Sequence, residues 1–153
     1  MTSISKAIHI DAPQPKVWDI LSNLATVQQY DPMVIHAHYT SDVKEGVGAS
    51  RHCDLPEGSY VKERITAWQP GQGYTLNVYE DGMPDSPFMT QDARFSLAEN
   101  GQGTVVTMTF DYDLNPDAPV GSQEVSQMFA EEVLPGLLAG LKQWVETGAP
   151  IPS

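Results

Sequence analysis

The chain of 153 residues has about the length of one domain, and its hydrophobic share of 41% is too high for a disordered chain. With 8 Lys and Arg against 20 Asp and Glu, the net charge is −12, which excludes the basic surface that nucleic acids and anionic membranes require. No apolar run reaches the roughly 18 residues of a membrane span, and the only cysteine, Cys53, can form neither a disulfide within the chain nor a cysteine-based zinc site. We therefore expect one cytoplasmic domain over residues 1–153, with no secretory signal, no nucleic-acid partner and no membrane insertion.

The first strand is predicted over residues 4–10, where apolar and polar residues alternate. Apolar residues then recur at helical spacing from Val17 to Leu24, which predicts one or two short helices that end before Pro32. Short turns with Gly and Pro follow, and they make neighbouring strands antiparallel. Six further strands are predicted over 33–41, 47–55, 59–68, 73–80, 88–98 and 103–114.

A long C-terminal helix is predicted over residues 122–147, because apolar residues from Val125 to Leu141 recur at helical period. Pro135 lies inside this helix and removes one backbone hydrogen bond, so we expect a kink there. The fold class is therefore α+β, with a sheet of seven antiparallel strands wrapped around the long helix. A sheet that curls in this way often encloses a pocket.

The hairpin that starts at residue 47 indicates which side chains face inward. Its turn, Pro56-Glu57-Gly58, places Cys53 opposite Val61 and Arg51 opposite Glu63 on the mainly apolar face, which must face the core. A buried charge is costly unless it is paired. Arg51 and Glu63 are therefore either a structural ion pair or a polar anchor that orients a ligand in an apolar cavity, and both interpretations stay open.

Alternation extends this inward face over the remaining strands, where it is rich in aromatic residues and Met, which suit irregular hydrophobic ligands. The alternative is that the same side chains fill a solid core. The inward set is Met33, Ile35, Ala37, Tyr39, Tyr74, Leu76, Val78, Met89, Gln91, Ala93, Phe95, Leu97, Val106, Met108, Phe110, Tyr112 and Leu114.

Two residue types with possible chemistry have a simpler interpretation. His36 and His38 share the strand face opposite to the apolar set, so we expect them to point outward, and we expect no metal site. Cys53 is expected to act as a small hydrophobic residue, because no base that could activate its thiol lies near it in the predicted register.

Several motifs, each degenerate alone, occur in the order that is typical of the START/SRPBCC superfamily. They are Ile8-x-Ile10-x-Ala12-Pro13-x-x-x-Val17-Trp18, Gly46-Val47-Gly48-Ala49-x-Arg51, Leu55-Pro56-Glu57-Gly58, Val61-x-Glu63-Arg64-Ile65 and Gly103-Thr104-x-Val106. The chain thus resembles the polyketide cyclase/dehydrase and lipid-transport branch, and it is similar to the birch-pollen allergen and to plant abscisic-acid receptors.

This resemblance implies a helix-grip fold with a cavity between the sheet and the long helix. Leu55 and Pro56 correspond to the loop that closes over the ligand in the plant receptors, and Glu63 corresponds to their inward glutamate. The resemblance also implicates the helix residues Phe129, Val133 and Leu137 in ligand contact. In relatives that are cyclases or aromatases, polar cavity residues steer the reaction, which makes Glu63 a candidate general base and Arg51 a candidate stabiliser of an enolate.

We therefore expect a protein that stores, transports or senses a small hydrophobic or amphipathic molecule, without a cofactor, as a monomer or homodimer. Two alternatives are a cyclase or aromatase that uses the same cavity, and a protein-interaction module with a filled core. The predicted ligand-binding residues are Ile35, Tyr39, Arg51, Cys53, Leu55, Pro56, Val61, Glu63, Leu76, Val78, Gln91, Phe95, Met108, Phe110, Tyr112, Phe129, Val133 and Leu137.

Overall fold

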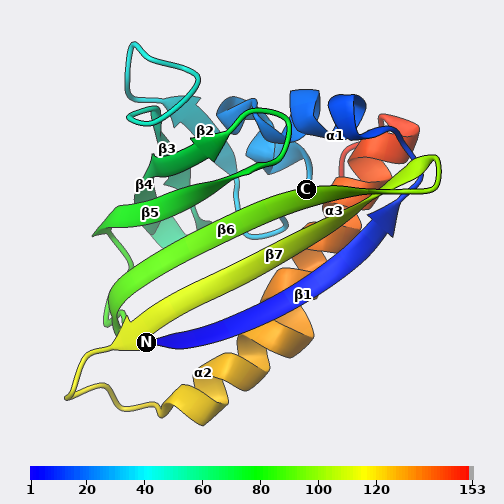
Figure 1. Ribbon diagram of the computed structural model, residues 1–153. Coiled ribbons are helices and arrows are strands. Elements are labelled where there is room, and N and C mark those ends of the chain that lie inside the picture. The colour runs from blue at the N-terminus through cyan, green and yellow to red at the C-terminus, as the bar shows by residue number, and fades with distance from the viewer. Residues whose placement is uncertain (152–153) are drawn as a thin grey trace.

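The computed structural model describes residues 1–151, which build one curved sheet of seven antiparallel strands (Figure 1). The order of the strands in the sheet is β1-β7-β6-β5-β4-β3-β2. Strands β2 to β7 thus each pair with the next strand in the sequence, whereas β1 pairs with β7. The strands are β1 (Thr2–Ile10), β2 (His36–Tyr39), β3 (Ser50–Asp54), β4 (Tyr60–Gln69), β5 (Gly73–Asp81), β6 (Phe88–Asn100) and β7 (Gly103–Leu114). The α+β class and the seven-stranded antiparallel sheet predicted from the sequence are thereby confirmed.

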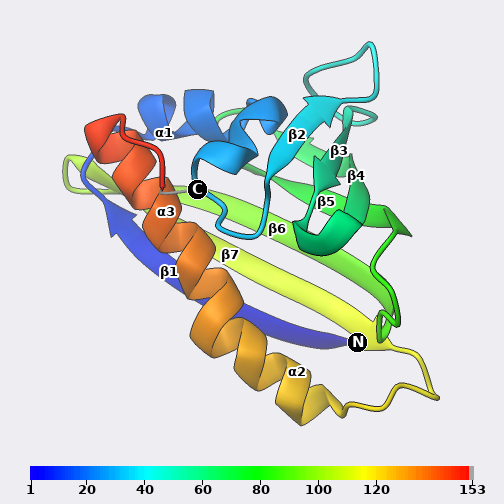
Figure 2. The same ribbon diagram turned by 180° about the vertical axis from the view of Figure 1, so that it is seen from behind.

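The helices lie on one side of this sheet (Figure 2). Two short helices follow β1, namely α1 (Gln14–Leu21) and a 3₁₀ helix (Leu24–Gln29), as the sequence predicted. The C-terminal helix consists of α2 (Ser122–Met128), one π turn (Phe129–Val133) and α3 (Leu134–Thr147), and it crosses the sheet diagonally. Within residues 1–151, no helix combines the length and the apolarity that crossing a bilayer would need.

A kink is expected at Pro135, and the structure has a π turn, Phe129–Val133, just before this residue. Proline has no N–H, and its ring crowds the carbonyl four residues earlier. The wider turn accommodates this, and the Leu134 N–H donates to the carbonyl of Phe129, five residues back. Phe129 and Val133, at the two ends of the turn, both pack against the core.

The hairpin of β3 and β4 has the predicted register. Arg51 lies opposite Glu63 and Cys53 opposite Val61, while His52 and Lys62 form a pair on the other face. The short turn Pro56–Gly58 sets this register, because its length fixes which residues meet.

Three residues of the predicted inward set are instead exposed. Met33 is 48% exposed because it lies in the connection before β2 and not within a strand. Met89 is 60% exposed because a β-bulge between Phe88 and Thr90 shifts the alternation, so that Phe88 packs against the core in its place. Ile35 is 64% exposed because it lies just before the edge strand β2, which pairs with β3 alone.

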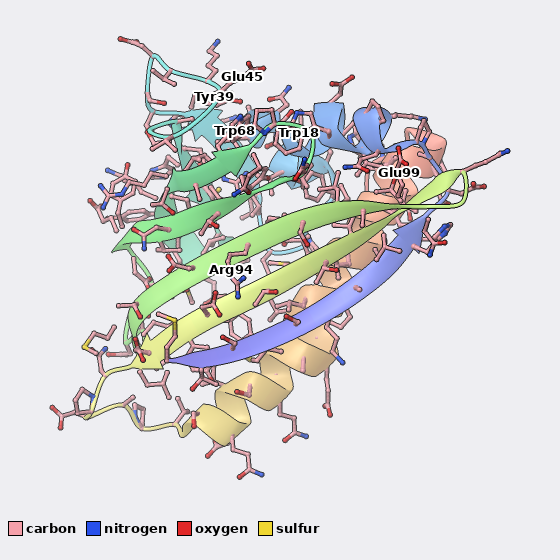
Figure 3. The ribbon with its side chains drawn as sticks, viewed as in Figure 1. Trp18, Tyr39, Glu45, Trp68, Arg94 and Glu99 are labelled. Atoms are coloured by element: carbon pink, nitrogen blue, oxygen red, sulfur yellow. The ribbon has the colours of Figure 1, made fainter. Side chains whose placement is uncertain are left out.

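An aromatic cluster closes the interior beside α1. The rings of Trp18 and Trp68 (Figure 3) meet edge to face with centroids 4.9 Å apart. Both rings also pack on Tyr74. The buried Tyr74 hydroxyl donates to the carbonyl of Leu21 at 2.9 Å, which ties β5 to the end of α1.

Candidate functional site

A cavity of about 790 Å³ lies between the sheet and the C-terminal helix. Its wall consists mainly of aliphatic, aromatic and Met side chains from the sheet, from α2 and α3, and from the segment before β2. The lining residues are Asp31, Pro32, Met33, Val34, Arg51, Cys53, Leu55, Val61, Glu63, Leu76, Val78, Met83, Pro87, Phe88, Gln91, Ala93, Phe95, Met108, Phe110, Val120, Glu124, Val125, Met128, Phe129, Glu132, Val133 and Leu137.

The structure brings all but four of the predicted ligand-binding residues together in this wall. Those that line it are Arg51, Cys53, Leu55, Val61, Glu63, Leu76, Val78, Gln91, Phe95, Met108, Phe110, Phe129, Val133 and Leu137. Alternation along each strand explains this agreement, because every second side chain must point to the face that the helix covers.

Four predicted residues lie outside the cavity wall. Ile35 points to solvent at the sheet edge, and Pro56 is exposed in the turn, so of the predicted loop pair only Leu55 lines the cavity. Tyr39 turns toward the 3₁₀ helix, and its hydroxyl accepts the Leu24 N–H at 3.0 Å.

Tyr112, the fourth, is only 1% exposed and is held by the start of α2. Its hydroxyl donates to the carbonyl of Ser122 at 2.8 Å and lies 2.6 Å from the Ser126 hydroxyl. The register placed this side chain on the correct face, but the position of α2 decided that its polar end meets the helix and not the cavity.

Arg51 and Glu63 form a buried ion pair in the cavity wall. The Arg51 Nε donates to Glu63 Oε1 at 2.9 Å, and Nη1 donates to the carbonyl of Leu24 at 3.0 Å. Burial alone lowers the pKa of Arg51, but the Glu63 carboxylate, together with smaller contributions from Cys53, Tyr74 and Tyr30, more than offsets this and holds the pKa above its ordinary value. The guanidinium therefore stays charged and is fixed on two partners.

Cys53 lies beside this pair, with its Sγ 3.6 Å from Glu63 Oε1. Burial raises the pKa of the Cys53 thiol to about 12, and the negative charge of Glu63 acts in the same direction against the opposing effect of Arg51. The thiol is therefore protonated at neutral pH, which does not suit a nucleophile.

Asp31 is a cavity residue that the sequence did not reveal. Its Oδ1 accepts the Met33 N–H at 2.9 Å. Burial raises the pKa of Asp31 to about 6; the Met33 hydrogen bond lowers it, whereas the charge of Glu63 raises it. Asp31 lies in the connection between the 3₁₀ helix and β2, where no periodicity predicts the direction of a side chain.

The cavity opens between the segment before β2, the β5–β6 connection and α2. Three partly exposed methionines, Met33, Met83 and Met128, surround this mouth at 48%, 37% and 45% exposure. Glu124 and Glu132 lie on the same rim. Glu132 is exposed to solvent on the helix surface, and it also borders the cavity.

Three phenylalanines form an aromatic wall on the helix side. Phe110 from β7 stacks on Phe129 from the π turn with ring centroids 4.2 Å apart. Phe88 meets both edge-on at 5.7 and 5.8 Å. The sequence placed Phe110 and Phe129 in the site but missed Phe88, because the bulge that turns it inward has no marker in the alternation.

The histidines of β2 and β3 lie on the outer face of the sheet, as the alternation predicted. His52 is 2.9 Å from Asp54 Oδ1 and stacks between His38 and Tyr60, with ring centroids 5.3 and 5.1 Å away. Across residues 1–151, no group of three or more His, Cys, Asp or Glu side chains has an arrangement that could hold a metal ion.

Comparisons with known proteins place this geometry in context. A family model described as polyketide cyclase / dehydrase and lipid transport matches residues 1–146. No curated protein matches the chain.

Several solved structures share the fold at low sequence identity. A START superfamily protein from Mycobacterium smegmatis has 18% identity and a TM-score of 0.80, with 96% of this chain and 99% of that chain covered. A protein from Thermus thermophilus has 20% identity and a TM-score of 0.75 over 96% and 99% of the two chains. The structure of Ara h 8.0201 has 13% identity and a TM-score of 0.74 over 94% and 97%. These similarities show a common helix-grip fold.

Proposed function

Because the chain belongs to the polyketide cyclase/dehydrase and lipid-transport family, we propose that it binds a small, mainly hydrophobic molecule in the cavity between the sheet and the helix. The observation that carries this proposal is the cavity itself. Its volume of about 790 Å³ lies in the range of small-molecule sites, roughly 300–1,000 Å³. A filled-core interaction module would need no such space.

The wall also has the composition of a binding site. Most lining side chains are apolar, so burial of the ligand's apolar surface supplies most of the binding free energy. Arg51, Glu63 and Asp31 supply the few polar groups that fix orientation. The three methionines at the mouth have flexible side chains, which lets the opening adapt to the shape of a ligand.

Native mass spectrometry of the purified protein, compared with the same sample after denaturation, tests this proposal. A small molecule lost on denaturation would identify the ligand class. If the protein is empty, titration with the neutral fluorophore N-phenyl-1-naphthylamine tests whether the cavity accepts an apolar guest.

A pair of variants assigns that binding to the cavity. Ala93→Phe on β6 fills the space from the inward face, whereas Ala98→Phe adds the same side chain to an exposed position of the same strand. We expect loss of fluorophore binding in the first variant and wild-type binding in the second. Equal binding by both variants, or no binding by the wild type, would reject a cavity-binding function.

A second function, cyclisation of a polyketide-type substrate, is favoured by one observation. Asp31, with a pKa of about 6, and Glu63 lie in the same wall as the charged Arg51. In such a reaction one carboxylate removes a proton next to a carbonyl, a carbon–carbon bond forms, and water leaves, while Arg51 stabilises the enolate. Incubation of a poly-β-ketone thioester with the protein, followed by mass spectrometry for the loss of water, tests this. Turnover that Glu63→Gln abolishes while binding persists would favour the enzyme over the carrier.

A further inference from the structure

We infer that the ligand is an amphipathic amine, whose protonated nitrogen meets carboxylates in the cavity, and not a fatty-acid-like carboxylate. This inference rests on the proposed binding function and names the chemical class of the ligand. It starts from the sign of the charges around the cavity. The wall formed by residues 1–151 holds four carboxylates, Asp31, Glu63, Glu124 and Glu132, and one positive side chain, Arg51.

The single positive group is already engaged. Arg51 donates to Glu63 through Nε and to the Leu24 carbonyl through Nη1, at 2.9 and 3.0 Å. A ligand carboxylate would have to compete with Glu63 for this guanidinium, and it would add a negative charge to a wall with an excess of them. The site is therefore poorly suited to an anionic head group.

Hydrogen-bond acceptors, in contrast, are available. Oδ1 of Asp31 accepts the Met33 N–H, and Oε1 of Glu63 accepts from Arg51 and Cys53. No hydrogen bond from residues 1–151 reaches Oδ2 of Asp31 or Oε2 of Glu63. An ammonium group has three donors and no acceptor, so it fits two partly buried carboxylates with an unused oxygen each.

The aromatic wall favours the same class of ligand. Phe88, Phe110 and Phe129 all line the cavity, with ring centroids 4.2 to 5.8 Å apart. Faces of aromatic rings attract cations, and they equally accept the apolar part of an amine. At the mouth, Glu124 and Glu132 add negative charge, and the net charge of −12 attracts cations over a longer range.

Three ligands with the same chain and different head groups test this inference. Decylamine, decanol and decanoate are titrated against the protein loaded with N-phenyl-1-naphthylamine. The titration is done at pH 7, at which decylamine is protonated and decanoate is ionised. We expect decylamine to displace the fluorophore at concentrations at least about tenfold lower than decanoate, with decanol between them. Equal or tighter displacement by decanoate would overturn the inference and leave the proposed function intact. If the protein binds neither the fluorophore nor any of the three ligands, the proposed function itself is rejected.

Isosteric variants assign the preference to named carboxylates. Asp31→Asn and Glu63→Gln remove the charges inside the cavity, and Glu99→Gln removes one from the exposed end of β6 (Figure 3). We expect the first two to weaken decylamine binding about fivefold or more and to leave decanol binding unchanged, which also shows that each variant is folded. Glu99→Gln should change neither. Unchanged decylamine binding in both cavity variants would overturn the inference.

Discussion

At the scale of single residues, the two inner carboxylates of the cavity wall, Glu63 and Asp31, have different environments. Glu63 has a buried cation beside it, whereas Asp31 has only a backbone N–H at 2.9 Å and the more distant Arg51. Ionisation of Asp31 is therefore costly, and its pKa of about 6 lies above the ordinary value of 3.8. A carboxylate whose ionisation is made costly by burial is typical of binding and catalytic sites, which often reduce the stability of the fold.

The raised pKa of Asp31 predicts how stability depends on pH. Below about pH 4 the Asp31 carboxyl is protonated in both the folded and the unfolded chain, so its ionisation does not lower the free energy of unfolding. As the pH rises from about 4 to about 6, the unfolded chain ionises this carboxyl freely and the folded protein does not, so stability falls over this interval. Asp31→Asn keeps the acceptor for the Met33 N–H, and we expect it to be more stable than wild type by about 1–2 kcal/mol at pH 7 and nearly equal at pH 4.

Urea denaturation at the two pH values measures this difference. Asp117→Asn is the matched control, because it removes the same charge from an exposed position. A gain in stability for Asp31→Asn that is the same at both pH values would show that ionisation of Asp31 is not its cause.

The Arg51–Glu63 pair predicts strong coupling between two substitutions. Arg51→Met leaves the Glu63 carboxylate buried without its cation, so we expect a loss of about 3–5 kcal/mol. Glu63→Leu added to this variant removes the unpaired charge, and the double variant should regain most of that loss. The free energy of unfolding of the two single variants and the double variant is measured in urea. A double variant as unstable as Arg51→Met would mean that packing, and not charge, holds this site.

At the scale of elements, the C-terminal helix is positioned by small residues. Gly140 of α3 faces the end of the 3₁₀ helix so closely that a Cβ would overlap the carbonyl oxygen of Tyr30. One turn earlier, a Cβ on Gly136 would be 3.5 Å from Pro32 Cγ, an ordinary contact. This approach holds the segment that carries Asp31 against the helix, and it thereby sets one side of the cavity mouth.

The two glycines give a matched pair of substitutions with opposite effects. Gly140→Ala forces the helix and the segment at Tyr30 apart, and we expect a loss of about 1–3 kcal/mol. The added methyl group of Gly136→Ala fits without a clash, and alanine has the higher helix propensity, so this substitution should be neutral or stabilise the protein by about 0.5–1 kcal/mol. Thermal unfolding of both variants checks this, and similar melting temperatures would contradict the close packing at Gly140.

At the scale of the whole molecule, the cavity separates the sheet from the helix that covers it, and under the proposed function a bound ligand would fill that space. A ligand that binds only the folded state stabilises it by about 2.7 kcal/mol at a concentration of 100 times its Kd. For a domain of this length about 1 kcal/mol shifts the melting temperature by about 2–4 °C. We therefore expect the best ligand to raise Tm by about 5–10 °C.

Differential scanning fluorimetry measures this shift. The Ala93→Phe variant, whose cavity is filled, should show none of it, and Ala98→Phe should show all of it. A shift of equal size in both would place the ligand elsewhere on the protein.

The sequence alone predicted the seven strands, the two short helices, the long helix and the START/SRPBCC resemblance, and all are confirmed. It also predicted that Arg51 lies opposite Glu63 on the inward face of the sheet. These features follow from local rules, because alternation determines the face of a strand residue and a short turn determines the register of a hairpin.

Only the tertiary structure decided the rest of the site. The bulge that brings in Phe88, the helix that captures the hydroxyl of Tyr112, and the connection that presents Asp31 each depend on segments far apart in the sequence meeting in space. The volume of the cavity depends on the same packing, since identical inward side chains fill a core or surround a space according to how far the helix lies from the sheet. Local patterns contain no information about that separation, so most of the wall of the site was predicted from the sequence and the space within it was not.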